Sequence, residues 1–233
     1  MFDRAHHRQV ATVLRAINAE LLRTHRCYFG GGTAIVLRHG EYRESADIDF
    51  LISDIDGYRV LRELITDHGI NALTDRPLTP LRDVRADQYG IRTYLDVDGT
   101  PIKFEIIHEG RINLDTPTAD DLVCGVTTLS VLDMAASKLL ANADRWADRS
   151  THSRDLIDLA MLAPPPETLY TAIGKAANAY GTSIERCLTA AIDYLNEDPH
   201  RLDDCMRALQ MPDTLSVALR RRIAELRPEP AGT

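Results

Sequence analysis

The chain has 233 residues, of which 44% are hydrophobic, and it carries a formal net charge of −8 at pH 7. This length can form one large domain or two smaller ones, each with a full core. The acidic balance argues against a protein that binds nucleic acid over its whole surface, although a local basic patch remains compatible with it. No apolar run approaches the roughly 20 residues that cross a bilayer. The four cysteines are scattered and no signal peptide is recognisable, so we expect a cytoplasmic protein with reduced thiols and no membrane insertion.

The first predicted element is an amphipathic helix over residues 4–25, where apolar side chains recur at helical spacing. We expect it to pack against a sheet that begins at residues 27–30. His6 and His7 lie near its start. We interpret both as solvated histidines rather than metal ligands.

The densest chemistry lies in residues 28–53, YFGGGTAIVLRHGEYRESADIDFLIS. Three glycines lead through a threonine into a short predicted helix over residues 34–39, and backbone N–H groups at such a helix start can receive a phosphate. Asp47 and Asp49 alternate with apolar residues, so in a strand both carboxylates share one face. Hard oxygen ligands at this spacing suit Mg²⁺, with Mn²⁺ as the alternative ion. Together these features predict a site for a nucleoside triphosphate.

This pattern of glycines, a hydroxyl residue, a short helix and Asp-x-Asp resembles the nucleotidyltransferase superfamily with a DNA polymerase β-like fold. The segment GGGTAIVLRHGEYRESADIDF is similar, more closely, to the AbiEii/AbiGii toxin family, which includes the MenT-type nucleotidyltransferase toxins. The resemblance implies an α/β (α+β) fold, in which a polymerase β-like core with a mixed sheet flanked by helices is followed by a helical C-terminal region. It also implies a nucleotidyltransferase that acts in a toxin–antitoxin or phage-defence system.

Beyond this stretch, residues 57–68 predict another amphipathic helix, and residues 69–83 read as a loop or irregular edge. The hydrophobic period then changes to two. Residues 89–97 and 101–108 form two alternating runs joined by Asp98-Gly99, which predicts a β-hairpin.

The second arm of this hairpin carries Lys103 and Glu105 on one face. The superfamily places a third carboxylate on a strand well downstream of Asp-x-Asp, and Glu105 matches that position best. The resemblance implies that it completes the metal site or acts as general base on the attacking hydroxyl. Asp96 and Asp98 are the alternatives, and an exposed, structurally paired Glu105 is the other interpretation.

Residues 120–129 read as a short strand with an N-cap threonine before a helix over residues 129–146. That helix carries Lys138 and is followed by the block HSRDLIDLAML, residues 152–162. The family has a lysine-helix block followed by an (Arg/Lys)-Asp-x-x-Asp-Leu block, and both are recognisable here. The resemblance implies that Lys138 contacts the triphosphate, that Asp155 holds Lys138 or positions the acceptor, and that Arg154 adds a phosphate contact. A buried ion pair that clamps two helices is the alternative, above all for Asp158.

Three prolines at residues 164–166 break the chain, and only helical patterns follow. We therefore expect a nucleotidyltransferase core with its N-terminal helix over residues 1–126, a helical region over 127–228 and a disordered tail over 229–233. The basic run at residues 220–222, with Arg227, either contacts a nucleic acid backbone or is a solvated helix end.

The expected reaction is an in-line attack on the α-phosphorus of a bound nucleotide that expels pyrophosphate. The Ser45 hydroxyl lies beside the expected metal site and reads as turn-forming, with modification directed by an antitoxin as a further hypothesis. The predicted catalytic residues are Asp47, Asp49, Glu105, Lys138 and Asp155. The predicted metal ligands are Asp47, Asp49 and Glu105. The predicted nucleotide-binding residues are Gly31, Gly32, Thr33, Arg43, Ser45, Lys138 and Arg154.

The predicted function is the transfer of a nucleoside monophosphate from a nucleoside triphosphate to tRNA or another RNA, by a toxin that has a cognate antitoxin protein. Two alternatives stay open. One is the same chemistry on a small molecule such as an aminoglycoside, or on a protein side chain. The other is a non-catalytic relative that binds a nucleotide.

Overall fold

The computed structural model describes residues 2–228, and the chain divides into two compact units. The first unit comprises Met1–Glu41 and Ser45–Ser130, and the second comprises Tyr42–Glu44 and Val131–Thr233. The short segment Tyr42–Glu44 thus belongs to the second unit, although both of its flanks belong to the first. The expected disordered tail, residues 229–233, lies outside the described residues.

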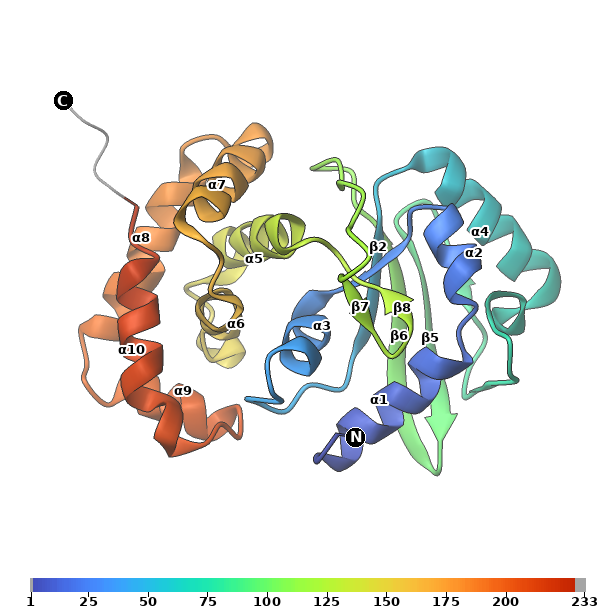
Figure 1. Ribbon diagram of the computed structural model, residues 1–233, viewed down its shortest axis with the longest axis horizontal. Coiled ribbons are helices and arrows are strands. Elements are labelled where there is room, and N and C mark those ends of the chain that lie inside the picture. Colours follow the sequence, from blue (N-terminus) through green and yellow to red (C-terminus); the bar gives the residue numbers. More distant parts are fainter. Residues whose placement is uncertain (1, 229–233) are drawn as a thin grey trace. The chain divides into compact units, whose positions relative to one another are not determined.

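The first unit is built on a mixed sheet with the strand order β1-β2-β6-β5-β3, in which β4 also pairs with β5. Strands β2 and β6 are parallel, and the other neighbouring pairs are antiparallel. Figure 1 shows β2, β6 and β5 side by side. A separate hairpin pairs β7 with β8. The strands are β1 (Tyr28–Gly30), β2 (Ile48–Ile52), β3 (Thr79–Pro80), β4 (Arg85–Ala86), β5 (Gly90–Val97), β6 (Thr100–His108), β7 (Leu122–Val123) and β8 (Val126–Thr127).

Three aromatic rings fix how the central strands pack. Phe29, Phe50 and Phe104 come from β1, β2 and β6 and are fully buried. The ring centroids of Phe29 and Phe50 are 5.5 Å apart, and those of Phe50 and Phe104 are 5.7 Å apart. Because side chains alternate along a strand, burying Phe50 directs Asp49 to the opposite face.

The hairpin predicted from Asp98-Gly99 is confirmed. Strands β5 and β6 pair in antiparallel register from Gly90↔Ile107 to Val97↔Thr100. Asp98 and Gly99 have φ values of 52° and 80°, and positive φ at both central residues is the requirement of a type I′ turn.

The single helix predicted over residues 4–25 is wrong, because the chain breaks between α1 (Ala5–Ala16) and α2 (Ala19–Thr24). Ile17 has an extended backbone and forms a β-bridge with Thr74. The Asn18 side chain then accepts a hydrogen bond from the Leu21 N–H and caps α2, which favours a new helix start over continuation. The other helices of this unit are α3 (Gly31–Arg38), which packs on β1 and β2, α4 (Ile55–His68), and the 3₁₀ helix η1 (Ile70–Leu73).

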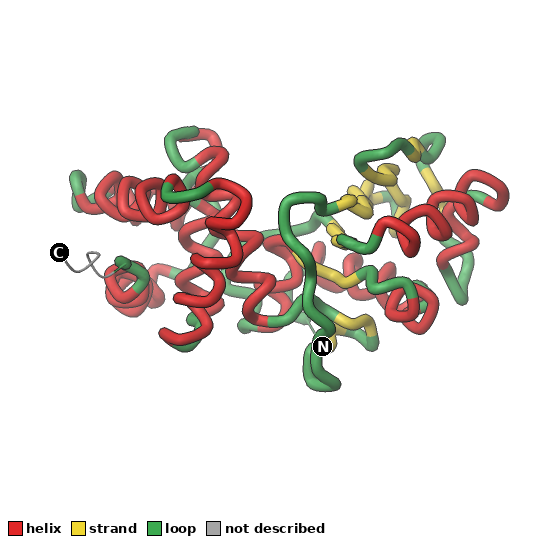
Figure 2. Tube along the Cα trace, turned by 90° about the horizontal axis from the view of Figure 1, so that it is seen from above, coloured by secondary structure: helices red, strands yellow, loops and turns green. Residues whose placement is uncertain are grey.

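The described part of the second unit contains helices and connecting segments but no strand. Figure 2 shows the strands in yellow and the helices in red. The expected α+β class, a mixed sheet with helices and a helical C-terminal region, is confirmed. Between residues 2 and 228, no helix combines the length and apolar character that a membrane span requires. The elements of the second unit are α5 (Val131–Arg145), η2 (Arg149–Thr151), α6 (Arg154–Leu162), α7 (Pro166–Tyr180), α8 (Ser183–Asn196), α9 (Arg201–Ala208), η3 (Asp213–Leu215) and α10 (Ser216–Glu225).

Candidate active site

The glycine turn between β1 and α3 packs directly against one of the predicted carboxylates. Gly31 has a φ of 67°, and a Cβ atom built there would lie 2.6 Å from Oδ2 of Asp49. Both facts restrict this position to glycine, because L side chains rarely adopt that φ and no real Cβ atom approaches another heavy atom so closely. The turn therefore brings the first backbone amides of α3 next to the Asp49 carboxylate.

The sheet register brings a second carboxylate beside the first. Asp49 on β2 and Glu105 on β6 are Cα partners in the parallel pair, and residues in register share a face of the sheet. Asp47 is exposed and immediately precedes β2. The two alternatives to Glu105 lie elsewhere, since Asp96 pairs with Pro101 near the hairpin end and Asp98 lies in the turn.

Two cations accompany Glu105. The Lys103 Nζ lies 2.6 Å from its Oε2 atom, and the Arg92 Nε lies 3.4 Å from its Oε1 atom. Burial lowers the pKa of Lys103, but the bond and charge of Glu105 and the charges of Asp49 and Asp47 more than offset this, so the Lys103 pKa is raised. The same face of the sheet thus holds the carboxylates and Lys103, whose pKa these carboxylates raise.

No group of three His, Cys, Asp or Glu side chains within residues 2–228 is arranged to hold a metal ion. The donor chemistry of this face nevertheless fits a hard divalent cation, because Asp47, Asp49 and Glu105 offer only carboxylate oxygens. The contact between Gly31 and Asp49 also places the glycine turn next to that carboxylate. The oxygen donors of these three side chains are therefore of the type that Mg²⁺ prefers.

Two hydroxyl groups meet at the same turn. Thr33 Oγ1 and Ser45 Oγ lie 2.7 Å apart and share a hydrogen bond. Thr33 belongs to the first turn of α3, while Ser45 precedes Asp47 by two residues. The structure therefore joins the glycine turn to the segment that leads into the Asp-x-Asp strand.

The remaining predicted residues lie in the second unit, where all of them except Arg154 belong to a buried ion network. Lys138 on α5 donates to Asp155 and Asp158 on α6, at 3.0 and 2.6 Å. Arg145 also binds Asp155, with its Nε 2.7 Å from Oδ2. Lys138 is only 6% exposed and Asp158 is fully buried. Buried charges require such pairing, because an isolated ion in a low-dielectric interior is costly.

Asp158 also anchors the segment Tyr42–Glu44 within this unit. Its Oδ1 accepts from the Tyr42 hydroxyl and from Arg43 Nε, and its Oδ2 accepts from Arg43 Nη2, each at 2.7 to 2.8 Å. The third guanidinium nitrogen of Arg43 donates to the Glu44 carbonyl. Each guanidinium nitrogen of Arg43, a predicted nucleotide-binding residue, therefore has a protein partner in the structure.

The carboxylates of this network stay ionised. Burial by itself raises the pKa of Asp158. The charges and hydrogen bonds of Arg43 and Lys138 more than offset this effect, so the net shift of the pKa is downward. The pKa of Asp155 is likewise lowered, because burial is outweighed by Lys138 and Arg145. Arg154 differs from its neighbours: within the described chain its side chain has no ion pair or hydrogen bond, and it is partly exposed.

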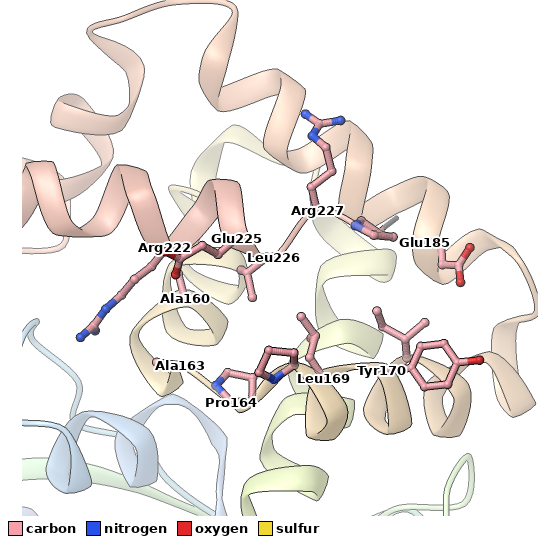
Figure 3. A pocket seen from close by; sticks show the side chains of 13 residues that line it. Ala160, Ala163, Pro164, Leu169, Tyr170, Glu185, Arg222, Glu225, Leu226 and Arg227 are labelled. Atoms are coloured by element: carbon pink, nitrogen blue, oxygen red, sulfur yellow. The ribbon is translucent and has the colours of Figure 1, made fainter. Parts of the chain in front are cut away.

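A pocket of about 500 Å³ in the second unit contains none of the predicted site residues (Figure 3). Its wall includes the apolar residues Leu169 and Leu226, with arginine and glutamate side chains at the edge. The basic run beside it is largely neutralised within the unit. Arg220 pairs with Asp203, Arg221 with Glu225 and Arg227 with Asp193, while Arg222 donates to the sulfur of Met161.

His7 forms contacts that its sequence neighbourhood does not predict. The interpretation of a solvated side chain is wrong for this residue, which is fully buried, whereas its neighbour His6 is exposed. No local sequence signal separates the two, because the partners of His7 lie more than 30 residues away in the chain.

The model of the AbiEii family, described as a nucleotidyl transferase AbiEii toxin of type IV toxin–antitoxin systems, matches residues 12–230. The chain belongs to this family. It is therefore a nucleotidyltransferase of the toxin type, as the motifs predicted. A crystal structure of an H. pylori protein that is assigned as a nucleotidyltransferase is also similar, with 14% sequence identity, a TM-score of 0.46, and coverage of 96% of this chain and 97% of that one. No curated protein matches the sequence.

Proposed function

We propose that this AbiEii-family nucleotidyltransferase uses a divalent cation to transfer a nucleoside monophosphate from a nucleoside triphosphate to an RNA acceptor, with tRNA as the first candidate. The observation that carries the proposal is the pairing of Asp49 with Glu105 on the strands beside the Gly31 turn. Carboxylates for a cation and backbone amides for a phosphate lie together there, which is what phosphoryl chemistry on a nucleotide requires.

In this proposal Asp47 and Asp49 hold Mg²⁺, or Mn²⁺ in its place, and Glu105 either joins them or acts as base. The ion, when bound, neutralises charge that develops on the phosphate oxygens. The amides of Gly31 and Gly32 and the Thr33 hydroxyl donate to the β- and γ-phosphates, and Ser45 supplies a second hydroxyl.

The transfer step exchanges one bond at the α-phosphorus for another. The acceptor hydroxyl oxygen forms a bond to the α-phosphorus, the bond from that phosphorus to the bridging oxygen breaks, and pyrophosphate leaves. The hydroxyl proton passes to a carboxylate, for which Glu105 is the candidate in register with Asp49. Lys103, whose Nζ lies 2.6 Å from Oε2 of Glu105, holds that carboxylate in place.

The roles predicted for Lys138, Asp155, Arg43 and Arg154, namely contacts to the triphosphate or the acceptor, remain part of the proposal. Arg154 is suited to a phosphate contact because, within the described residues, its guanidinium makes no hydrogen bond or ion pair and interacts with Asp148 only through charge. Lys138, Asp155 and Arg43 are bound to other side chains of their own unit, so any contact they make with a ligand must coexist with those bonds or replace them.

The proposal is tested by incubating the purified protein with each labelled nucleoside triphosphate, Mg²⁺ and total tRNA, and resolving the products on a gel. Label should enter tRNA with the intact protein and not with the Asp47→Asn/Asp49→Asn variant, and chelation of the cation should stop transfer. Parallel reactions contain an aminoglycoside or a protein mixture in place of tRNA. Label that enters only those acceptors would overturn the RNA assignment, and transfer that survives chelation would overturn the metal assignment.

A further inference from the structure

His7 is a buried polar group at the start of α1 that the proposed chemistry does not use. Its side chain has no solvent-exposed surface. Buried polar atoms in folded proteins nearly always have hydrogen-bond partners, and the partners they select show what the group holds together.

Both ring nitrogens of His7 are engaged. Its Nδ1 lies 2.7 Å from Oε1 of Glu41, and its Nε2 accepts the backbone N–H of Ser45 at 3.3 Å. A backbone N–H can only donate, so Nε2 must carry no proton. The remaining proton is therefore on Nδ1, from which it is donated to the Glu41 carboxylate. We call this pair of bonds the His7 bridge.

The His7 bridge links the two residues that flank the segment Tyr42–Glu44. Residues Tyr42–Glu44 belong to the second unit, whereas Glu41 and Ser45 belong to the first. His7 thus forms hydrogen bonds to the residue just before this segment and to the residue just after it. Ser45 then pairs through its hydroxyl with Thr33.

Glu41 gives the bridge a fixed base. Its carboxylate also accepts the backbone N–H groups of Asp3 and Arg4, at 2.8 and 3.2 Å, which precede α1 and lack helical acceptors. Burial by itself raises the Glu41 pKa. The hydrogen bonds from these amides and from His7 more than offset this effect, so the pKa is lowered and the carboxylate is a stable anion. The bond from Glu41 therefore holds His7 in the tautomer that can accept from Ser45.

We propose that His7 is a positioning residue for nucleotide binding: in its neutral, Nδ1-protonated form it holds the Ser45 backbone so that the Ser45 and Thr33 hydroxyls are set for the triphosphate. This inference rests on the proposed function, which assigns those two hydroxyls to the nucleotide. Because Ser45 contributes to binding rather than to the reacting atoms, loss of the His7 bridge should raise the KM for the nucleotide and leave kcat nearly unchanged.

Two substitutions of His7 test its hydrogen bonds to Glu41 and to Ser45 separately. The side-chain nitrogen of Asn stands close to Nδ1, so His7→Asn keeps a donor for Glu41 and removes the acceptor for Ser45. The side-chain oxygen of Gln reaches the Nε2 position, so His7→Gln keeps the acceptor for Ser45. His6→Gln is the matched control, because His6 is the adjacent residue on the same helix and is exposed.

We expect His7→Asn to raise the KM, or the Kd measured by calorimetry with each nucleoside triphosphate and Mg²⁺, by about tenfold, which corresponds to about 1.4 kcal/mol. His7→Gln should stay within about threefold of the native protein, and His6→Gln should be unchanged. Thermal melts report the folded fraction of each variant. A folded His7→Asn protein with native KM and Kd, or equal losses in the Asn and Gln variants, would show that His7 has only a structural role.

Nitrogen-15 NMR of the native protein reads the bridge without any enzymatic assay. The His7 ring should show a protonated Nδ1 and an unprotonated Nε2 at neutral pH, and an imidazolium or an Nε2-protonated ring would overturn the bridge itself. If the native protein bound no nucleoside triphosphate, the proposed function and the positioning role would fail together, whereas the NMR signature would still show whether the bridge exists.

Discussion

Gly31 and Asp49 are in direct packing contact, so that a Cβ atom at position 31 would lie 2.6 Å from the Asp49 Oδ2. The glycine turn that begins α3 and the strand β2 that carries Asp49 therefore cannot be altered independently at this point. Any side chain at position 31 must displace either the turn or the carboxylate.

Gly31→Ala should lower nucleotide transfer by about a hundredfold or more, because displacement of reacting groups by about 1 Å has effects of that size. Gly40→Ala is the matched control: Gly40 also has a positive φ, 81°, but a Cβ there would meet nothing within 4 Å. It should cost about 1 kcal/mol of stability and preserve activity. Steady-state kinetics and urea unfolding of both variants check this, and equal losses of activity would contradict it.

Asp49→Asn should abolish transfer and weaken binding of Mg²⁺ or Mn²⁺, because the amide keeps the size of the side chain and removes its charge. Asp96→Asn removes a carboxylate from the same sheet, on β5 near the hairpin end, and should leave both properties unchanged. Isothermal titration with Mn²⁺ and the tRNA labelling assay measure the two effects. Full activity of the Asp49 variant would remove this residue from the site.

Lys138→Met should destabilise the protein by about 3–5 kcal/mol, because it leaves Asp155 and Asp158 buried with one cation fewer. Lys175→Met is a suitable comparison, since Lys175 pairs with the fully buried Asp133 in the same unit. If Lys138 binds the triphosphate, its variant should lose nucleotide affinity at temperatures where it is folded, while the Lys175 variant should not. Equal affinities would return Lys138 to a structural role.

Acid should weaken the buried network. The folded-state pKa values of Asp155 and Asp158 are lowered from 3.8, so their contribution to the free energy of unfolding is present above about pH 4 and is lost as pH falls through the lower folded values. Urea unfolding at pH 5 and pH 3 should show less pH dependence for Asp155→Asn than for the native protein. Asp213→Asn, at an exposed position, should keep the native dependence. An Asp155 variant with the native pH dependence would contradict the assignment.

Patterns of short range carried most of the correct predictions. The hairpin turn at Asp98-Gly99, the shared face of Lys103 and Glu105, and the alternation that buries Phe50 depend on positive φ and on strand periodicity. These properties belong to residues that are neighbours in sequence. The family assignment rests on the same local motifs and agrees with the family model.

Contacts between distant residues could not be read in this way. The helix break at Ile17 depends on a bridge to Thr74, and the burial of His7 depends on Glu41 and Ser45. The amphipathic pattern around residues 4–25 is equally compatible with one helix or two, because periodicity does not report the partner that stops a helix.

The residues alone established the chemistry of the chain: glycines that accept a positive φ, alternating carboxylates, and a lysine helix followed by Asp155 and Asp158. Folding decided which charges meet. It placed Asp49 in register with Glu105 across 56 positions of sequence, and it paired Arg43 with Asp158 in the second unit. The physical reason is that side-chain type and spacing govern local conformation, whereas strand register and buried ion pairs are selected by packing of the whole chain.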